Sequence, residues 1–327
     1  MGETAALAHR LPARTDTLLS LIDHWAKAFP GAPALGALDY AALRNESTHD
    51  GDTAALTTVE SHDPLVAVPS TLIGLADGAV AFSAQTPAGN PSPGELLFPV
   101  RRDLKETDFV RMPQNRLIAM AMALAKRYEF SRDDRIYLSG PFDDPGTWLA
   151  LVAAIYAGTP ISLDPEGATL LWILDGSDAV VDSRTRVLHL RTTSETFADM
   201  HRRHPELTLV NGLALPEGCG LPICSDPRDP PHTVSTTLGR PLGGTEVMIV
   251  DPRTGMDRLL YEAGEVWLRG KGLMTGYASG SRAFEAARFL PTGILGYLDS
   301  EGRLVLSDGK SDLDAIHDDD DDDADTG

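Results

Sequence analysis

The sequence predicts an α/β fold layered on parallel sheets, followed by a distorted β subdomain that begins near Val234. Apolar runs at 135–139 and 160–163 flank a helical pattern at 148–156. This strand–helix–strand order is typical of a buried parallel sheet. Later short runs rich in Val, Ile, Leu and Trp are bounded by Gly, Pro or Asp, which is the punctuation of strands and turns. These predicted strands lie at 246–250, 265–268 and 303–306.

The N-terminal part of the chain is predicted to be helical at two places. The first helix covers residues 18–28, and a second short helix begins near Tyr40 after a turn. The apolar face of the first helix consists of Leu18, Leu21, Ile22 and Trp25. Residues 47–65 are polar and irregular, so no regular element is predicted there.

Three further elements complete the predicted α/β region. Apolar residues at helical spacing predict a helix over 115–128, and an apolar run predicts a strand over 207–210. A helix over 197–204 would carry a basic cluster on its outer face, which we interpret as solvated rather than functional. That cluster consists of His201, Arg202 and Arg203.

Length and composition set the broad class of the protein. A chain of 327 residues with 42% hydrophobic content can bury a sizeable core in one large domain or two subdomains. The sequence contains no run of 18 apolar residues and no long apolar segment near its start, so neither a membrane span nor a secretory signal is predicted. Cys219 and Cys224 are too few for a disulfide framework and make a poor zinc site. A cytoplasmic setting is therefore expected.

The net charge of −20 argues against binding to nucleic acid or to an anionic membrane surface. Seven of these charges come from aspartates in the C-terminal stretch 318–325, which is predicted to be a disordered, solvated tail. Flexible carboxylates lack the preformed geometry of a Ca²⁺ site, but such a tail could recruit a basic protein partner. An acidic scaffold is therefore one of the alternatives for this chain.

Four motifs in the second half resemble the adenylate-forming superfamily of acyl-CoA synthetases, nonribosomal adenylation domains and luciferases. The first is Gly-Arg-Pro at 239–241, and the second is the "GE…RG…M-x-GY" pattern at 264–277. The third, "TG-x-x-GY", stands at 292–297, and a hinge-like sequence follows with Lys310 and Asp312. The resemblance covers most of residues 15–313. It implies a fold like the large N-terminal region of that family, with layered parallel sheets.

The resemblance also implies a function: activation of a carboxylic acid with ATP and Mg²⁺. The family's phosphate-binding loop corresponds to 79–91, where Ser83, Thr86 and Gly89 are kept. Small residues in such a loop let backbone N–H groups wrap an anion. Here Pro87 lacks that donor, so an ordinary turn-rich loop is the alternative interpretation. Near the family's acyl pocket, where a histidine is usual, this chain has Asp144, which we interpret together with Asp143 as a helix N-cap.

The residues that would hold the nucleotide are altered. Glu217 occupies the position of the Mg²⁺-binding glutamate, and Leu213 replaces the aromatic residue that stacks on adenine. Ile294 replaces the aspartate that accepts the ribose hydroxyls, and Gly309 replaces an arginine that also reaches the ribose. The loss of two hydrogen bonds to charged groups, at about 1.5–3 kcal/mol each, should lower nucleotide affinity by a factor of about 10²–10⁴.

In the family, a mobile C-terminal domain beyond the hinge supplies a catalytic lysine. We expect this chain to lack that domain. The sequence therefore predicts a degenerate, non-catalytic homologue that acts as a ligand-binding or interaction module. The alternative is an AMP-forming carboxylate ligase that uses Glu217 for Mg²⁺ and receives the C-terminal domain from another chain. The predicted organisation is an N-terminal arm at 1–14, an α/β region at 15–233, a β subdomain at 234–313 and an acidic tail at 314–327.

Overall fold

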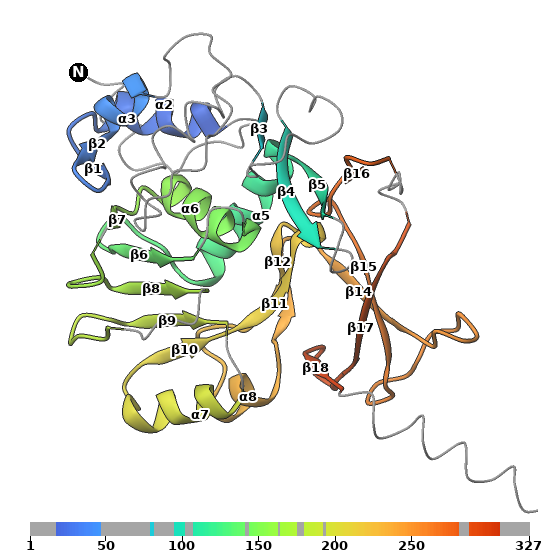
Figure 1. Ribbon diagram of the computed structural model, residues 1–327. Helices are drawn as coiled ribbons and strands as arrows, with labels where there is room; N and C mark the ends of the chain where they lie inside the picture. Colours follow the sequence, from blue (N-terminus) through green and yellow to red (C-terminus); the bar gives the residue numbers. More distant parts are fainter. Residues whose placement is uncertain are drawn as a thin grey trace, which may run out of the picture.

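A seven-stranded sheet forms the base of the fold (Figure 1). Its strand order is β10-β9-β8-β6-β7-β1-β2, and every neighbouring pair is parallel except β1 and β2. The predicted α/β class with parallel sheets is therefore confirmed. The computed structural model describes residues 18–46, 79–81, 95–101, 107–140, 144–162, 164–174, 180–191, 194–280 and 288–307. The strands are β1 (Pro33–Leu35), β2 (Leu38–Asp39), β6 (Ile136–Ser139), β7 (Ile161–Ser162), β8 (Leu170–Ile173), β9 (Val187–Leu190) and β10 (Thr208–Val210).

The predicted strand–helix–strand unit is present as β6, α6 (Pro145–Ala157) and β7. All thirteen residues of α6 are buried, which explains why this segment is apolar around its whole circumference. The Asp144 side chain accepts a hydrogen bond from the Gly146 N–H at 2.7 Å, so its predicted role as N-cap is confirmed. The helix begins three residues earlier than predicted, because Pro145 suits the first helical position.

The other helices surround this unit. Helix α5 (Gln114–Arg127) packs beside α6, while α2 (Leu18–Ala28) and α3 (Tyr40–Glu46) lie together near the β1 edge (Figure 1). Helices α7 (Ser194–Arg203) and α8 (Pro231–Thr236) lie together next to β10. The bounds of α2 agree with the sequence prediction, and those of α5 and α7 differ from it by one to three residues.

Three smaller sheets form the other side of the molecule (Figure 1). One contains β11 (Gly212–Leu215), β12 (Gly220–Cys224) and β13 (Arg240–Pro241). The second contains β14 (Glu246–Val250), β15 (Gly264–Arg269), β17 (Leu290–Leu298) and β18 (Leu304–Leu306). The third contains β16 (Gly276–Tyr277), β5 (Thr107–Pro113), β4 (Glu95–Arg101) and β3 (Ala79–Ala81). The three predicted strands of the β subdomain are thus confirmed as β14, β15 and β18. Helix α8 spans Val234, and a subdomain boundary near that residue stays a proposal.

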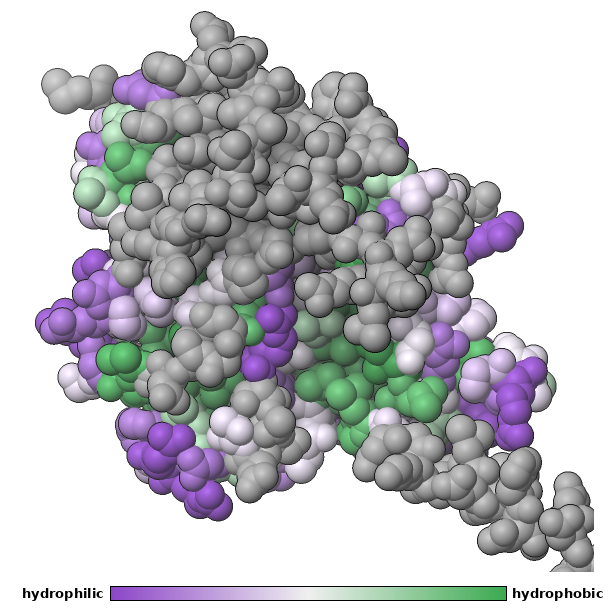
Figure 2. Space-filling view, viewed as in Figure 1, coloured by the Kyte–Doolittle hydropathy of each residue, from purple (hydrophilic) through white to green (hydrophobic). Residues whose placement is uncertain are grey.

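Hydrophilic and apolar residues are concentrated on different parts of the molecular surface. Hydrophilic residues gather over α7, and apolar residues gather over β17 and β18 (Figure 2). Arg202 and Arg203 are exposed as predicted and pair with Asp199, whereas His201 is half-buried. Among the described helices, none combines the length and the apolar character that crossing a membrane requires.

Asp134 joins the turn after α5 to the central sheet. Its carboxylate accepts hydrogen bonds from Arg186 through Nε and Nη2, both at 2.8 Å, and from Thr169 and Ser131. Burial raises the pKa of Asp134, but the hydrogen bonds from Arg186, Thr169 and Ser131 outweigh it, so the pKa is lowered. A lowered folded-state pKa stabilises the protein above the unfolded value of about 4, and this contribution is lost as the pH falls through the folded pKa.

We therefore expect Asp134→Asn to lower the free energy of unfolding by about 1.5–3 kcal/mol at pH 7, because charge-assisted hydrogen bonds are lost. The difference from the wild type should shrink as the pH is lowered toward about 3. Urea unfolding followed by circular dichroism at both pH values measures it. Asp199→Asn, which alters an exposed ion-paired aspartate on α7, is the control and should cause no measurable change. A pH-independent loss in Asp134→Asn would contradict the electrostatic explanation.

Candidate functional site

A crevice of about 300 Å³ lies where the three smaller sheets meet. It is bounded by the end of β11 and the 3₁₀ helix η1 (Pro216–Gly218), by β15 and β17, and by β16. Its lining residues are Leu215, Glu217, Glu265, Tyr277, Leu290, Pro291, Thr292 and Gly293. The volume is at the lower end of the range for sites that hold small molecules.

Glu217 enters the crevice from η1. Pro216 starts this single turn, and Cys219 ends it with a positive φ of 57°, so the chain reverses sharply around the glutamate. Glu217 is only 8% exposed, and its Oε1 accepts a hydrogen bond from the Tyr277 hydroxyl at 2.8 Å. The Glu217 carbonyl also accepts from the Met274 N–H at 2.8 Å. These contacts hold η1 against β16 and fix the direction of the carboxylate.

Glu265 faces the crevice from β15, next to an irregularity in its pairing with β17. Its Oε1 accepts a hydrogen bond from the Gly293 N–H at 2.8 Å, and its Oε2 accepts from Trp267 Nε1 at 3.0 Å. Thr292 donates its hydroxyl to the Val266 carbonyl at 2.7 Å, which anchors the same segment of β17. The rim formed by Thr292 and Gly293 is therefore tied to β15 by both side-chain and backbone groups.

Of the residues predicted to bind nucleotide, Leu213, Glu217 and Ile294 lie in the described part of the chain. The structure brings Glu217 into one crevice with Thr292 and Gly293, the residues that precede Ile294. Ile294 itself is half-buried and packs against the hydrophobic core. Leu213 is 5% exposed and also belongs to the core, while Leu215 lines the crevice. The remaining predicted positions, namely Ser83, Thr86, Gly89, Asp143, Gly309, Lys310 and Asp312, lie outside the described residues.

Glu265 and Tyr277 were not assigned a role from the sequence. Both belong to the "GE…GY" motif at 264–277, so a signal was present, but the motif alone does not say which side chains face a ligand. Among the described lining residues, the charged ones are Glu217 and Glu265. Carboxylate oxygens suit Mg²⁺, but the described residues contain no cluster of three or more potential metal ligands. This donor set fits Mg²⁺ only when a bound ligand adds further oxygens.

Comparison with known proteins finds similarity to AMP-binding enzymes and CoA ligases. Residues 190–278, which contain η1 and β16, match the family described as AMP-binding enzyme. 4-Coumarate–CoA ligase-like 8 from Arabidopsis thaliana is 27% identical over 182 residues, which are 53% of this chain and 32% of the relative. Peroxisomal OPC-8:0-CoA ligase 1 from Arabidopsis thaliana is 29% identical over 127 residues, 38% of this chain and 22% of the relative. Over this region the chain is similar to AMP-binding enzymes of the adenylate-forming superfamily.

The solved structures show the same fold. The crystal structure of VinN superposes with a TM-score of 0.67 at 17% identity, over 91% of this chain and 100% of that chain. O-succinylbenzoate coenzyme A synthetase (MenE) from Bacillus subtilis, in complex with ATP and magnesium ion, superposes with a TM-score of 0.55 at 18% identity. That match covers 64% of this chain and 49% of the synthetase. The chain matches only between about a fifth and a third of the length of the two curated relatives above.

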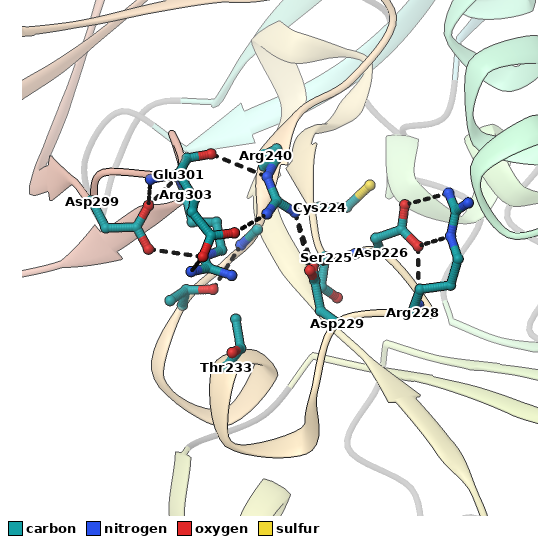
Figure 3. Close-up of polar contacts among 12 residues, drawn as sticks. Cys224, Ser225, Asp226, Arg228, Asp229, Thr233, Arg240, Asp299, Glu301 and Arg303 are labelled. Carbon is teal, nitrogen blue, oxygen red and sulfur yellow. Dashed lines mark hydrogen bonds and ion pairs between the residues drawn. The ribbon is translucent and has the colours of Figure 1, made fainter.

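Ion pairs connect β13 to the turn between β17 and β18 (Figure 3). Arg240, in the Gly-Arg-Pro motif on β13, pairs with Asp229 at 3.0 Å and with Glu301 at 2.8 Å. Arg303 pairs with Asp299 and Glu301, both at 2.8 Å, inside the turn between β17 and β18. Since β17 carries Thr292 and Gly293, this network helps to hold the rim of the crevice against the sheet that contains β12 and β13.

A second hollow lies next to Asp144, where the family resemblance would place the acyl pocket. Its volume is about 10 Å³, which is room for about one water molecule. The ring of His189 stacks on Trp172 at 3.8 Å between centroids, and the Arg191 guanidinium pairs with Asp144. Burial, together with the charge of Arg191, lowers the pKa of His189 to about 3, so this histidine is neutral. The hollow is too small for an acyl chain.

Proposed function

We propose that this chain is a non-catalytic member of the AMP-binding, acyl-CoA ligase-like family that acts as a ligand-binding or interaction module. The observation that carries the proposal is the composition of the crevice. It keeps Glu217 beside Thr292 and Gly293, yet the next residue is Ile294, which has no acceptor and packs against the core. The scaffold of a nucleotide site is retained while a principal contact to the nucleotide is lost.

Electrostatics support the same proposal. ATP is a polyanion, and the charged side chains among the described lining residues, Glu217 and Glu265, are carboxylates. Placing like charges side by side costs several kcal/mol unless a cation separates them. In this proposal ATP or AMP with Mg²⁺ binds weakly, through Glu217 and the phosphate oxygens together. The small volume of the hollow near Asp144 also supports the non-catalytic function, because a carboxylic acid would find no ready acyl pocket there.

The alternative function is an AMP-forming carboxylate ligase of the acyl-CoA synthetase or adenylation type. The retained and well-positioned Glu217 favours it, and relatives named as CoA ligases share the matched region. A small carboxylic acid would then be the substrate. A partner protein belongs to both versions of the proposal, and so does a cytoplasmic setting, which rests on the low cysteine content.

Calorimetric titration with Mg-ATP separates the two functions. For the non-catalytic module we expect no saturation below about 1 mM, because the lost ribose contacts correspond to about 10²–10⁴ in affinity. Pyrophosphate release with ATP and 4-coumarate should also stay at background, with the Bacillus subtilis O-succinylbenzoate synthetase and its own acid as positive control. Micromolar binding of Mg-ATP, or pyrophosphate release above background, would establish the ligase instead.

A further inference from the structure

The wall of the crevice offers hydrogen-bond acceptors and apolar surface. Leu215, Leu290 and Pro291 supply the apolar part, which suits the flat face of a base. Glu217 and Glu265 supply carboxylate oxygens, and the hydroxyl of Tyr277 already donates to Glu217. A ligand that complements this wall must bring its own donors, such as hydroxyl groups.

Glu265 is the acceptor best prepared for such a ligand. Its two oxygens each accept one hydrogen bond from the protein, from Gly293 N and Trp267 Nε1, which fixes the plane of the carboxylate. An ionised carboxylate has about four acceptor positions, so each oxygen keeps capacity for one more donor. Since Gly293 lies on the rim beside Ile294, Glu265 presents that capacity close to the place where the acceptor side chain is lost.

The lining also selects against anions. Among the eight described residues that line the crevice, none is a lysine, an arginine or a histidine. A low-dielectric crevice with two acidic residues concentrates negative potential and opposes the entry of phosphate groups. Its volume of about 300 Å³ favours a compact ligand over one with an extended polyphosphate chain.

From these features we infer that Glu265 is a ligand-binding residue that makes the crevice selective for an uncharged nucleoside over nucleoside phosphates. Its carboxylate accepts hydrogen bonds from the two sugar hydroxyls, while the apolar wall contacts the base. This inference rests on the proposed function, since it specifies the ligand class of the same crevice.

The test compares four ligands by calorimetry on the full chain: adenosine, 2′,3′-dideoxyadenosine, AMP and Mg-ATP. Adenosine should bind most tightly, and 2′,3′-dideoxyadenosine should bind at least about tenfold more weakly, since it lacks the donors for a charged acceptor. AMP and Mg-ATP, which each carry about two negative charges near pH 7, should both bind more weakly than adenosine. This comparison needs no variant, so it does not depend on whether a mutant folds.

Glu265→Gln then tests the residue itself. It should lower adenosine affinity about tenfold and remove most of the difference between adenosine and 2′,3′-dideoxyadenosine. The matched control is Glu246→Gln on the adjacent strand β14, where the carboxylate pairs with Arg269 outside the crevice. That variant should bind all four ligands as the wild type does, and thermal unfolding of both variants checks that they are folded.

The outcomes distinguish the two proposals. Equal binding of adenosine and its dideoxy analogue overturns the role of Glu265 but leaves the non-catalytic function standing. The absence of binding by all four ligands also overturns the inference, and it leaves the interaction module. Mg-ATP bound at micromolar concentration and more tightly than adenosine overturns both, because the crevice would then be a working ATP site.

Discussion

Gly239→Ala is expected to lower the free energy of unfolding by about 2–5 kcal/mol. Gly239 has a φ of +81°, a left-handed conformation that costs an alanine about 1–2 kcal/mol. A Cβ atom at this position would lie 2.2 Å from the backbone nitrogen of Ser225 and 2.3 Å from the carbonyl oxygen of Cys224. Backbone atoms cannot move aside as a flexible side chain can, so overpacking adds about 1–3 kcal/mol.

The physical reason for this glycine is the close approach of two strands. Residues 224 and 240 are paired between β12 and β13, and the Gly239 carbonyl also accepts a hydrogen bond from the Leu304 N–H at 2.8 Å. Gly239 is thus the point where β13 contacts both β12 and β18. A shift there would disturb the neighbouring ion pairs of Arg240 as well.

Gly244→Ala is the matched control for this prediction. Gly244 has nearly the same φ, +80°, but no atom lies within 4 Å of an added Cβ. Only the conformational cost of about 1–2 kcal/mol should appear. Urea unfolding of the two variants measures the difference, and equal losses in both would show that backbone conformation, rather than the contact with Ser225, limits this position.

The parts of the fold that could be predicted from sequence are those with continuous apolar runs. The segments that became β6, α6 and β7 are buried apart from the partly buried Tyr137, so their apolar composition indicates a parallel unit. In contrast, β13 and β16 have two residues each, which is too short for any periodic pattern. Their place in the sheets depends on long-range pairing, and the motifs at 239–241 and 264–277 indicated it only through the family resemblance.

The side chains of the site that face a ligand were harder to predict from the sequence. Leu213 was expected to contact a base. In the structure Leu213 is buried in the core, while Leu215, two residues further along β11, packs against the same core and also lines the crevice. How deep each leucine lies depends on the tertiary packing of β11, which the sequence does not show, and a contact of Leu213 with a base stays a prediction. The location of Glu217 depended less on register, because Pro216 and the turn at Cys219 define η1 locally.

Arg127→Met is expected to lower the free energy of unfolding by about 3–5 kcal/mol. Arg127 lies at the end of α5 and donates to the carbonyl oxygens of Cys224 and Arg240, both at 2.9 Å, and of Pro241 at 2.7 Å. One guanidinium therefore joins α5 to β12 and β13. Each hydrogen bond from a charged donor contributes about 1.5–3 kcal/mol, and solvent recovers part of what three carbonyls lose. Methionine keeps a similar apolar stem, so the loss is assigned to the hydrogen bonds.

Two variants show whether this loss comes from the fork of the guanidinium. Arg228→Met removes an arginine whose side chain is 77% exposed and bonds to Asp226 two residues away, so it should leave stability unchanged within error. Arg127→Lys keeps the charge, but a single ammonium group cannot reproduce the fixed fork and should recover only part of the loss. Full recovery by lysine would show that charge near β12 and β13 is sufficient. Partial recovery would establish that the geometry of Arg127 holds the Gly-Arg-Pro segment, and with it the sheet that leads into η1, in place.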